Sequence, residues 1–343
     1  MERFDRDTCK KVNEWLRTSV KKIVIIPHVN PDGDAIGASI GLNDVMLNAG
    51  FESQVIVPND FPVYLEWLGN LVKPLIYEQN MEQCKRLISE ADALFFLDFN
   101  DTKRLGKLED FMANISTPVI LIDHHPDPQI NAEYLFSDTD VSSTAELVYD
   151  FIEAIDMLDH LRSDGANGLL TGIIADTGSF SHNASRHSTF RIVGELINKG
   201  AQKDRINESL FNNFSEKRMR LLGYCLSEKM EIYQQYRSAL IWLTSEELKR
   251  FDFHPGDTEG FVNYPLSVKG VVFSAFFMEK NGIVKASFRS KGSFPTNEFS
   301  GAHFSGGGHR NASGGETKLP MREALELFRS LLPKYASQLM EQI

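Results

Sequence analysis

Cysteine is scarce in this sequence. Its 343 residues include three, Cys9, Cys84 and Cys225, and no two of them have C-x-x-C spacing. Scattered single cysteines supply neither the thiolate cluster of a structural zinc site nor the paired bridges of a small secreted domain. We therefore exclude a zinc knuckle and a disulfide framework, and we expect a protein of the reducing cytoplasm.

Long apolar runs are also missing. None approaches the roughly 18 residues of a membrane span, and the first twenty residues are polar and charged. We expect neither membrane insertion nor secretion. The motifs G-x-x-x-x-G-K-[ST] and G-x-G-x-x-G do not occur, so nothing favours ATP-driven or dinucleotide redox chemistry.

Positive charge is in short supply. The chain has 36 Lys and Arg against 47 Asp and Glu, a net charge of -11. Because such a surface repels duplex nucleic acid, we expect no duplex partner, and any nucleic acid substrate should be short. One stretch, residues 285–318, is basic at +3, with two glutamates against five cations: Lys285, Arg289, Lys291, Arg310 and Lys318.

Short apolar runs alternate with amphipathic segments in the first half of the chain. The runs at 22–26, 54–57, 93–97 and 118–122 read as strands buried on both faces. Between the first two lies a helical pattern with Ile36, Ile40 and Leu47 on one face and Gly50 as a plausible C-cap. This β-α-β beginning predicts an α/β domain with a mainly parallel sheet. The pattern "GLLTGIIA" at 168–175 fits a helix or a strand.

The second half of the chain predicts a smaller domain. Residues 185–230 are polar and helical in propensity and read as a connector. Strand-like runs follow at 238–243, 270–279 and 282–290, with "EKNG" at 279–282 as a hairpin turn. Because a single core stops growing at about 250–300 residues, we expect an α/β domain (1–184), a helical connector (185–230) and a smaller α/β domain (231–343).

Acids and histidines follow the apolar runs of the first domain. Side chains at the carboxyl ends of parallel strands point into one crevice, so these residues should converge. A histidine pair after a strand is often only loop polarity, and the pattern gains weight from its repetition. The residues are His28, Asp32, Asp34, Asp98, Asp123, His124, His125 and Asp176.

This set of side chains suits divalent metal ions. Oxygen-rich sites with one or two imidazoles favour Mn²⁺ or Mg²⁺, whereas structural zinc prefers thiolates. Crowded carboxylates repel one another unless a cation lies among them. Two metals about 3.5–4 Å apart could clamp a hydroxide and a phosphoryl oxygen. We expect Gly33 and Gly37 to let the backbone pass close to such a centre.

Five motifs resemble a known family. "HVNPDGDAIG", "FLDFND", "IDHHPD" and "GIIADTGSF" look like the four motifs of the DHH phosphoesterases, and "SFRSKG…FSGGGHRNASGG" looks like the associated DHHA1 domain. The resemblance spans nearly the whole chain and is greatest to the cytoplasmic nanoRNase and pAp-phosphatase group, where pAp is 3'-phosphoadenosine 5'-phosphate.

The resemblance implies a role for each residue of the cluster. One Mn²⁺ would be held by His28, Asp32 and Asp98, and the other by Asp34, Asp98, His124 and Asp176. Asp98 would then bridge the two ions. Asp123 would be an acid that orients an imidazole, and His125 a catalytic group on the phosphate side. Mg²⁺ or Co²⁺ would be substitutes for Mn²⁺.

The basic stretch is the expected substrate-binding region. The run "SGGGH" could form an anion-holding nest of backbone N–H groups, or simply a turn. The resemblance implies that it closes over the far end of a nucleotide in a cleft between the domains. Phe294 and Phe299 could stack a base, although a place in the core fits them at least as well. The expected substrate-binding residues are Arg289, Ser290, Gly306, Gly307, Gly308 and His309.

The leading hypothesis is a Mn²⁺-dependent hydrolase that removes mononucleotides from very short RNA or the 3'-phosphate from pAp. A phosphodiesterase for linear or cyclic dinucleotides would use the same centre. An inorganic pyrophosphatase fits the glycine-rich loop less well. A nucleotide-sensing module without turnover is the non-enzymatic alternative, although no expected ligand is substituted. The sequence leaves a homodimer open.

Overall fold

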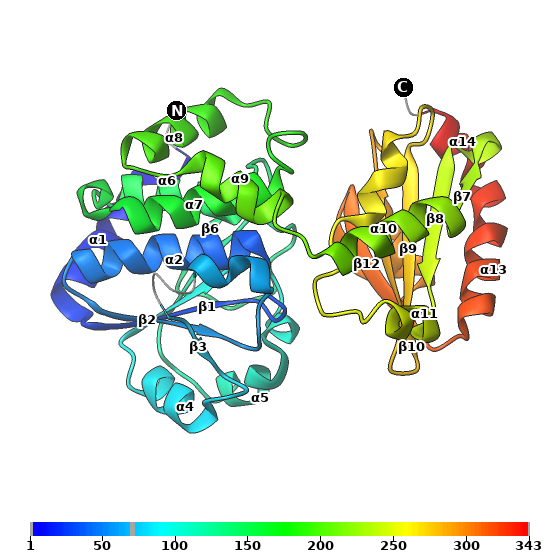
Figure 1. Cartoon of the computed structure of the whole chain (residues 1–343). Coiled ribbons are helices and arrows are strands. Elements are labelled where there is room, and N and C mark those ends of the chain that lie inside the picture. The colour runs from blue at the N-terminus through cyan, green and yellow to red at the C-terminus, as the bar shows by residue number, and fades with distance from the viewer. Residues whose placement is uncertain (1–2, 69–72, 342–343) are drawn as a thin grey trace. The chain divides into compact units, whose positions relative to one another are not determined.

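The computed structural model describes residues 3–68 and 73–341. Its contacts divide the chain into two compact units, Met1–Asn213 and Phe214–Ile343, blue to green and green to red in Figure 1. Each unit has its own sheet and core. The prediction of an α/β first domain followed by a smaller α/β domain is confirmed.

The first unit is built on a six-stranded sheet in the order β3-β2-β1-β4-β5-β6, with parallel pairing between neighbours. Side chains along its strands alternate between two cores, so that Ile23 and Ile25 face one and Val24 and Ile26 the other. The four predicted runs are therefore strands buried on both faces. The strands are β1 (Lys22–Pro27), β2 (Glu52–Val57), β3 (Leu75–Ile76), β4 (Ala93–Leu97), β5 (Val119–Asp123) and β6 (Tyr134–Ser137).

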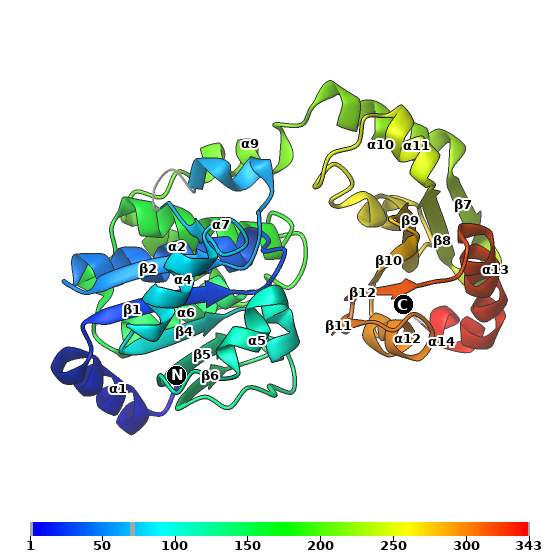
Figure 2. The same ribbon diagram turned by 90° about the horizontal axis from the view of Figure 1, so that it is seen from below.

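Helices cover both faces of this sheet. In Figure 1, α2, α6 and α7 lie on one side, and α4 and α5 lie on the other, which faces the viewer in Figure 2. The α-helices are α1 (Arg6–Ser19), α2 (Gly33–Asn48), α4 (Met81–Ser89), α5 (Glu109–Met112), α6 (Thr144–Ala154), α7 (Ser163–Asp176), α8 (His187–Asn198) and α9 (Lys203–Phe211). Short 3-10 helices are η1 (Val63–Leu65), η2 (Thr102–Leu108) and η3 (Leu158–His160).

Helix α2 is more deeply enclosed than its pattern predicts. Ile36 and Ile40 are fully buried, but Leu47, predicted on the same face, is 48% exposed because the end of the helix emerges from the core. Ala49 is the C-cap, and Gly50 follows it with φ +97°, a conformation that favours glycine.

Glycines let α2 and α7 pack backbone to backbone. A Cβ on Gly37 would lie 2.4 Å from the carbonyl oxygen of Gly168, and one on Gly33 would lie 2.5 Å from Cβ of Ala175. The two glycines predicted to admit a metal centre thus serve the contact between helices. A Cβ on Gly172 would lie 2.7 Å from Oδ1 of Asp34.

The segment 168–175, which fitted a helix or a strand, is part of α7. The predicted connector is also helical, and its helices are divided between the units. Helices α8 and α9 contribute Ile192, Leu196 and Ile206 to the first core, whereas α10 contributes Leu221 and Cys225 to a core of the second unit.

The second unit has a sheet in the order β11-β12-β10-β9-β8-β7, antiparallel except for the parallel pair β8-β9. Helices α10 and α11 lie on one side of it, and α12, α13 and α14 on the other (Figure 2). The strands are β7 (Met230–Tyr233), β8 (Ser238–Leu243), β9 (Phe273–Lys280), β10 (Ile283–Ser290), β11 (Gly307–His309) and β12 (Ala312–Thr317). The helices are α10 (Glu216–Glu228), α11 (Ser245–Arg250), α12 (Thr296–His303), α13 (Met321–Leu331), α14 (Ala336–Met340), η4 (Gln234–Tyr236), η5 (Phe261–Ser267) and η6 (Leu332–Tyr335).

Two local predictions for this unit can be checked. The β9-β10 turn has Asn281 at φ +54° and Gly282 at φ +75°, the pair of positive angles of a type I′ hairpin. Phe294 and Phe299 are each 1% exposed and lie in the aromatic core. They pack rather than stack on a base. Among the described residues, no helix has the length and apolar character to cross a membrane.

Candidate metal centre

The sheet brings three predicted ligands to one edge. Strands β1, β4 and β5 are parallel neighbours, with Pro27 paired to Leu97 and Leu97 paired to Ile122. The residues that follow these pairs, His28, Asp98 and Asp123 to His124, therefore leave the sheet at one level. Asp98 has φ +69°, so the chain turns sharply at this residue, directly after β4.

The first predicted ligand set is assembled. Nε2 of His28 lies 3.4 Å from Oδ2 of Asp98 and 3.9 Å from Oδ2 of Asp32. Nδ1 of His28 lies 2.8 Å from the carbonyl oxygen of Val29. Because a carbonyl can only accept, Nδ1 carries the proton and the lone pair is on Nε2, toward the acids. Asp32 caps α2, with Oδ1 accepting the N–H groups of Asp34 and Ala35.

The second predicted ligand set is assembled as well. Nε2 of His124 lies 3.5 Å from Oδ1 of Asp98, 3.8 Å from Oδ2 of Asp176 and 4.0 Å from Oδ2 of Asp34. Asp34 comes from the first turn of α2 and Asp176 from the last residue of α7. The two oxygens of Asp98 thus face different histidines, His28 and His124.

The electrostatics of the cluster favour a cation. Burial, and then the neighbouring Asp98, raise the pKa of Asp34 well above its ordinary value. Burial, and then Asp32, do the same for the pKa of Asp98. Within residues 3–68 and 73–341, the buried Oδ2 of Asp123 has no hydrogen-bond partner. Bound divalent cations would neutralise this repulsion, and the oxygen and imidazole donors suit Mn²⁺ or Mg²⁺.

Asp123 is hydrogen-bonded to His125. Its Oδ1 lies 2.8 Å from Nδ1 of His125. Burial raises the pKa of Asp123 to about 6, so at neutral pH the carboxylate is ionised and Nδ1–H donates to it. Burial, and then the charge of Arg104, lower the pKa of His125 to about 3. Asp98, Asp123 and His125 also form a third compact group, so the geometry alone leaves His125 as either a substrate-side group or a ligand.

The start of α6 touches the cluster, which the motifs did not predict. The N–H groups of Thr144 and Ala145 donate to Asp34 at 2.6 and 2.9 Å, and Oγ1 of Thr144 donates to Oδ1 of Asp98 at 2.8 Å. The sequence signal was the S-x-x-E pattern from Ser143 to Glu146, typical of a helix start.

Arg104 is a second residue that the motifs did not indicate. It lies on η2, and its carbonyl oxygen accepts the N–H of Val29 at 2.6 Å, which ties η2 to the segment after His28. Its side chain is exposed. Its positive charge is the second cause, after burial, of the lowered pKa of His125. A guanidinium here suits an anionic substrate.

The predicted glycine nest has a different structure. The N–H of Gly306 donates to the carbonyl oxygen of Ser300 at 3.1 Å, and Gly307–His309 forms the edge strand β11. A Cβ on Gly306 would lie 2.0 Å from the carbonyl oxygen of Gly314, and a Cβ on Gly308 would lie 2.7 Å from that of Ala312. The run is thus a strand rather than an open loop. Glycine is required at both positions because the strand packs closely against β12.

The other predicted substrate-binding residues lie nearby in the second unit. Arg289 and His309 both pair with Ala312, from the two sides of β12. Ser290 is committed to the fold, since its Oγ donates to the Phe294 carbonyl at 2.7 Å and accepts from Nδ2 of Asn311 at 2.7 Å.

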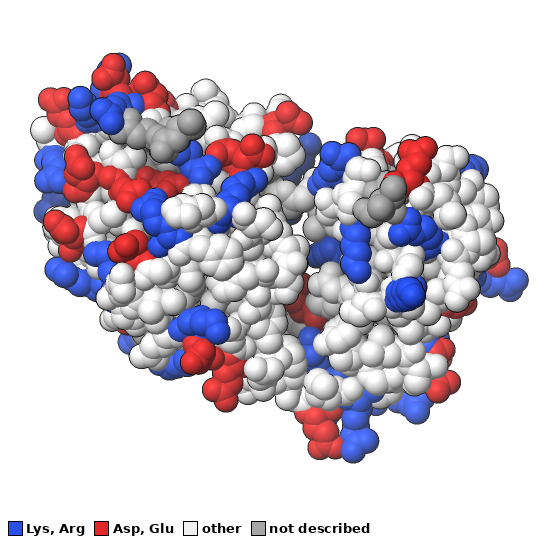
Figure 3. All heavy atoms as spheres, turned by 90° about the horizontal axis from the view of Figure 1, so that it is seen from above, with Lys and Arg blue, Asp and Glu red and all other residues white. Residues whose placement is uncertain are grey.

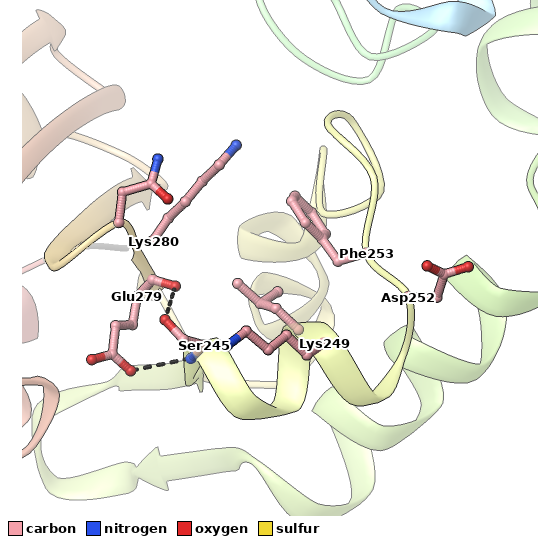
Figure 4. A pocket seen from close by; sticks show the side chains of 8 residues that line it. Ser245, Lys249, Asp252, Phe253, Glu279 and Lys280 are labelled. Carbon is pink, nitrogen blue, oxygen red and sulfur yellow. Dashed lines mark hydrogen bonds between the residues drawn. The ribbon is translucent and has the colours of Figure 1, made fainter.

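A surface pocket of about 350 Å³ lies elsewhere in this unit (Figure 4). Ser245 donates to Glu279 at its edge through both N–H and Oγ, each at 3.1 Å. None of the predicted site residues lines it. The lining residues are Ser245, Leu248, Lys249, Asp252, Phe253, Glu279, Lys280 and Asn281.

Comparisons with known proteins bear on the family of the chain. Residues 22–173 match the model of the DHH family, N-terminal domain, and residues 239–338 match that of the DHHA1 domain. The crystal structure of an exopolyphosphatase-related protein from Bacteroides fragilis is similar, with a TM-score of 0.94, 42% identity and 98% of each chain covered.

Two curated relatives resemble the chain over most of its length. The Streptococcus mutans protein named "Probable bifunctional oligoribonuclease and PAP phosphatase NrnA" is 29% identical over 85% of this chain and 88% of its own. A Thermus thermophilus protein named "Bifunctional oligoribonuclease and PAP phosphatase NrnA" is 28% identical over 92% and 90%. The chain therefore belongs to the DHH family of phosphoesterases and carries a DHHA1 domain in its second unit.

Proposed function

We propose that this protein is a two-metal, Mn²⁺-dependent phosphoesterase that hydrolyses short oligoribonucleotides to mononucleotides and pAp to AMP. The observation that supports two metals is the orientation of Asp98. Its Oδ2 faces His28 and its Oδ1 faces His124, at 3.4 and 3.5 Å. A carboxylate set between two imidazoles in this way is suited to bridge two cations.

The protein supplies two ligand sets. His28, Asp32 and Asp98 would hold one ion, and the second would be held by Asp34, Asp98, His124 and Asp176. When bound, two divalent cations provide a hydroxide nucleophile at neutral pH and stabilise charge on the phosphoryl oxygens.

Asp123 and His125 are proposed to act on the substrate side. The carboxylate fixes the ring of His125 through Nδ1, which is how an acid selects the tautomer and orientation of an imidazole. In this orientation His125 would lie on the phosphate side of the centre, near the nucleophile.

Short nucleotides are the proposed substrates for two reasons. The two curated relatives are named as oligoribonucleases and PAP phosphatases. In addition, the chain is acidic overall and has few cations to follow a long polyanion. On the face of the described residues drawn in Figure 3, Lys and Arg are interspersed with Asp and Glu rather than gathered in one broad area. We propose that Arg289 and His309 hold a phosphate remote from the scissile bond.

The test is one substrate panel assayed with wild type and Asp98→Ala. It comprises pAp, pApA, a 24-mer RNA, a cyclic dinucleotide and polyphosphate, each with Mn²⁺ and with a chelator. We expect rapid hydrolysis of pAp and pApA by wild type with Mn²⁺, slow hydrolysis of the 24-mer, and none by Asp98→Ala. Full activity in chelator-treated enzyme would overturn the metal proposal. Faster hydrolysis of the cyclic dinucleotide or polyphosphate would overturn the substrate assignment, and nucleotide binding without release would favour a sensing module.

A further inference from the structure

Thr144 contacts two carboxylates of the candidate metal centre from one position. Its Oγ1 donates to Oδ1 of Asp98 at 2.8 Å, and its N–H donates to Oδ2 of Asp34 at 2.6 Å. The N–H of Ala145 donates to the other oxygen of Asp34 at 2.9 Å. The side chain of Thr144 is fully buried. Thr144 thus contacts both Asp98, the proposed bridge between the ions, and Asp34, a proposed ligand of the second ion.

The position of Thr144 is itself fixed. It is the first residue of α6, and the preceding Ser143 caps the helix by accepting the N–H of Glu146 at 3.1 Å. The fully buried carboxylate of Glu146 accepts the N–H and Oγ of Ser142 at 3.1 and 2.6 Å, and Oγ1 of Thr189 on α8 at 2.9 Å. Glu146 therefore joins the turn before α6 to α8 and leaves Thr144 little room to move.

We propose that Thr144 is a positioning residue of the metal centre, which holds the Asp98 carboxylate at the angle where each of its oxygens faces a different histidine. This inference rests on the proposed two-metal function. A carboxylate can rotate about its terminal torsion, and a rotated Asp98 would present both oxygens to one side. The hydroxyl of Thr144 opposes that rotation because it binds Oδ1 alone. Partners that orient a metal ligand in this way govern metal affinity.

The hydroxyl can be separated from the packing of the side chain. Thr144→Val keeps the shape and the backbone N–H to Asp34 but removes the donor to Asp98. Thr144→Ser keeps the donor and removes a methyl group. Thr171→Val is the matched control, because Thr171 is also fully buried but its hydroxyl donates to the carbonyl of Asn167 at 2.7 Å, inside α7.

The experiment is a Mn²⁺ titration of full-length, nucleotide-free, chelator-treated enzyme, with bound Mn²⁺ followed by electron paramagnetic resonance. We expect Thr144→Val to weaken Mn²⁺ binding by about 10-fold or more, and Thr144→Ser and Thr171→Val to bind like wild type. If Thr144→Val binds like wild type, or Thr144→Ser is as weak as Thr144→Val, the proposal is wrong. Should Thr144→Val fail to fold, Thr144→Ala compared with Thr144→Ser makes the same decision.

The same titration separates this inference from the proposed function. Asp98→Ala serves as the reference for loss of the bridge. If wild type binds Mn²⁺ no better than Asp98→Ala, the two-metal centre and the role of Thr144 are both overturned. If wild type binds two ions and Asp98→Ala does not, the centre stands, and only the comparison of the Thr144 variants decides the role of the hydroxyl.

Discussion

Arg289 and His309 lie on either side of a single alanine. Arg289 of β10 and His309 of β11 both pair with Ala312 of the intervening strand β12. Paired residues in a sheet point to the same face, and neighbouring strands are about 4.8 Å apart. The two side chains therefore project from the same face of the sheet, on either side of the Ala312 methyl group. Two donors placed in this way on one face suit a phosphate group bound between them.

The shared pairing of Arg289 and His309 with Ala312 gives a prediction on substrate selection. Arg289→Ala and His309→Ala should reduce kcat/KM for pAp by about 10-fold, since each removes a charge-assisted hydrogen bond. Ala312→Leu should do the same by placing a larger side chain between the two donors. Turnover of bis-p-nitrophenyl phosphate, which needs only the metals, should be spared. Lys285→Ala is the control, because Lys285 lies in the same basic stretch but pairs with Glu316. Equal losses on both substrates would show that these residues serve the fold.

Removing His125 should separate turnover from metal content. Its ring is held by Asp123 rather than by a proposed ion, so His125→Ala should lower kcat by about 100-fold or more. Metal stoichiometry, measured by mass spectrometry, should stay at the wild-type value. Loss of one equivalent of metal would instead identify His125 as a ligand, as its grouping with Asp98 and Asp123 allows.

The raised pKa of Asp123 gives the metal-free protein a characteristic pH dependence. The folded state holds this proton up to a pKa of about 6, against 3.8 for an ordinary Asp. The unfolded state loses this proton at a lower pH. The contribution of the proton to the free energy of unfolding is therefore fully present below about pH 4, and this contribution of about 3 kcal/mol is lost as pH rises through 6. In urea unfolding of chelator-treated enzyme from about pH 4 to 7, the free energy of unfolding should depend less steeply on pH in Asp123→Asn than in wild type.

Asp92 provides a control of opposite sign. The N–H groups of Lys22 and Lys21 lower its pKa, so its contribution to stability is present at neutral pH and is lost as pH falls. Asp92→Asn should therefore remove a contribution to the free energy of unfolding that increases with pH. Identical pH slopes for wild type and Asp123→Asn would contradict the assignment of the buried proton to Asp123.

Arg104 should matter for charged substrates rather than for metal binding. Its backbone is tied to Val29, and its charge acts on His125. Arg104→Met should lower kcat/KM for pAp by about 10-fold and reduce the salt dependence of turnover. Mn²⁺ affinity should not fall. Lys103→Met, at the exposed neighbouring position, is the matched variant, and an equal loss in it would mean that Arg104 contributes only general positive charge.

The parts of the fold that follow a simple period could be predicted from the sequence. Continuous apolar runs identified β1, β2, β4 and β5, and the acids after them identified the candidate ligands, because strand ends in a parallel sheet converge. The exposure of Leu47 was not predicted, because an enclosed helix such as α2 is apolar on several faces and its pattern does not show that its end emerges from the core. The segment at 168–175 was ambiguous for the same reason, since a buried helix is apolar all round.

Long-range hydrogen bonds account for most of what was missed. Thr144 is 110 residues from Asp34 and 46 from Asp98 in the sequence, so no local pattern marks its role. The glycine run from Gly306 to Gly308 suggested a loop, because glycine in a sequence does not reveal whether space is needed for a ligand or for another strand. Here β12 takes that space at two of the three positions.

The glycine contact between α2 and α7 has a consequence for how this protein tolerates change. These helices carry Asp34 and Asp176, and a Cβ on Gly172 would come within 2.5 Å of Cβ of Ala145 and 2.7 Å of Oδ1 of Asp34. Any larger residue there must push Asp34, a proposed metal ligand, aside or separate the two helices. In a saturation mutational scan, Gly172 should therefore be as intolerant as the ligands themselves. Sequence variation at this position would then report on the geometry of the metal centre, although glycine has no side chain with which to bind anything.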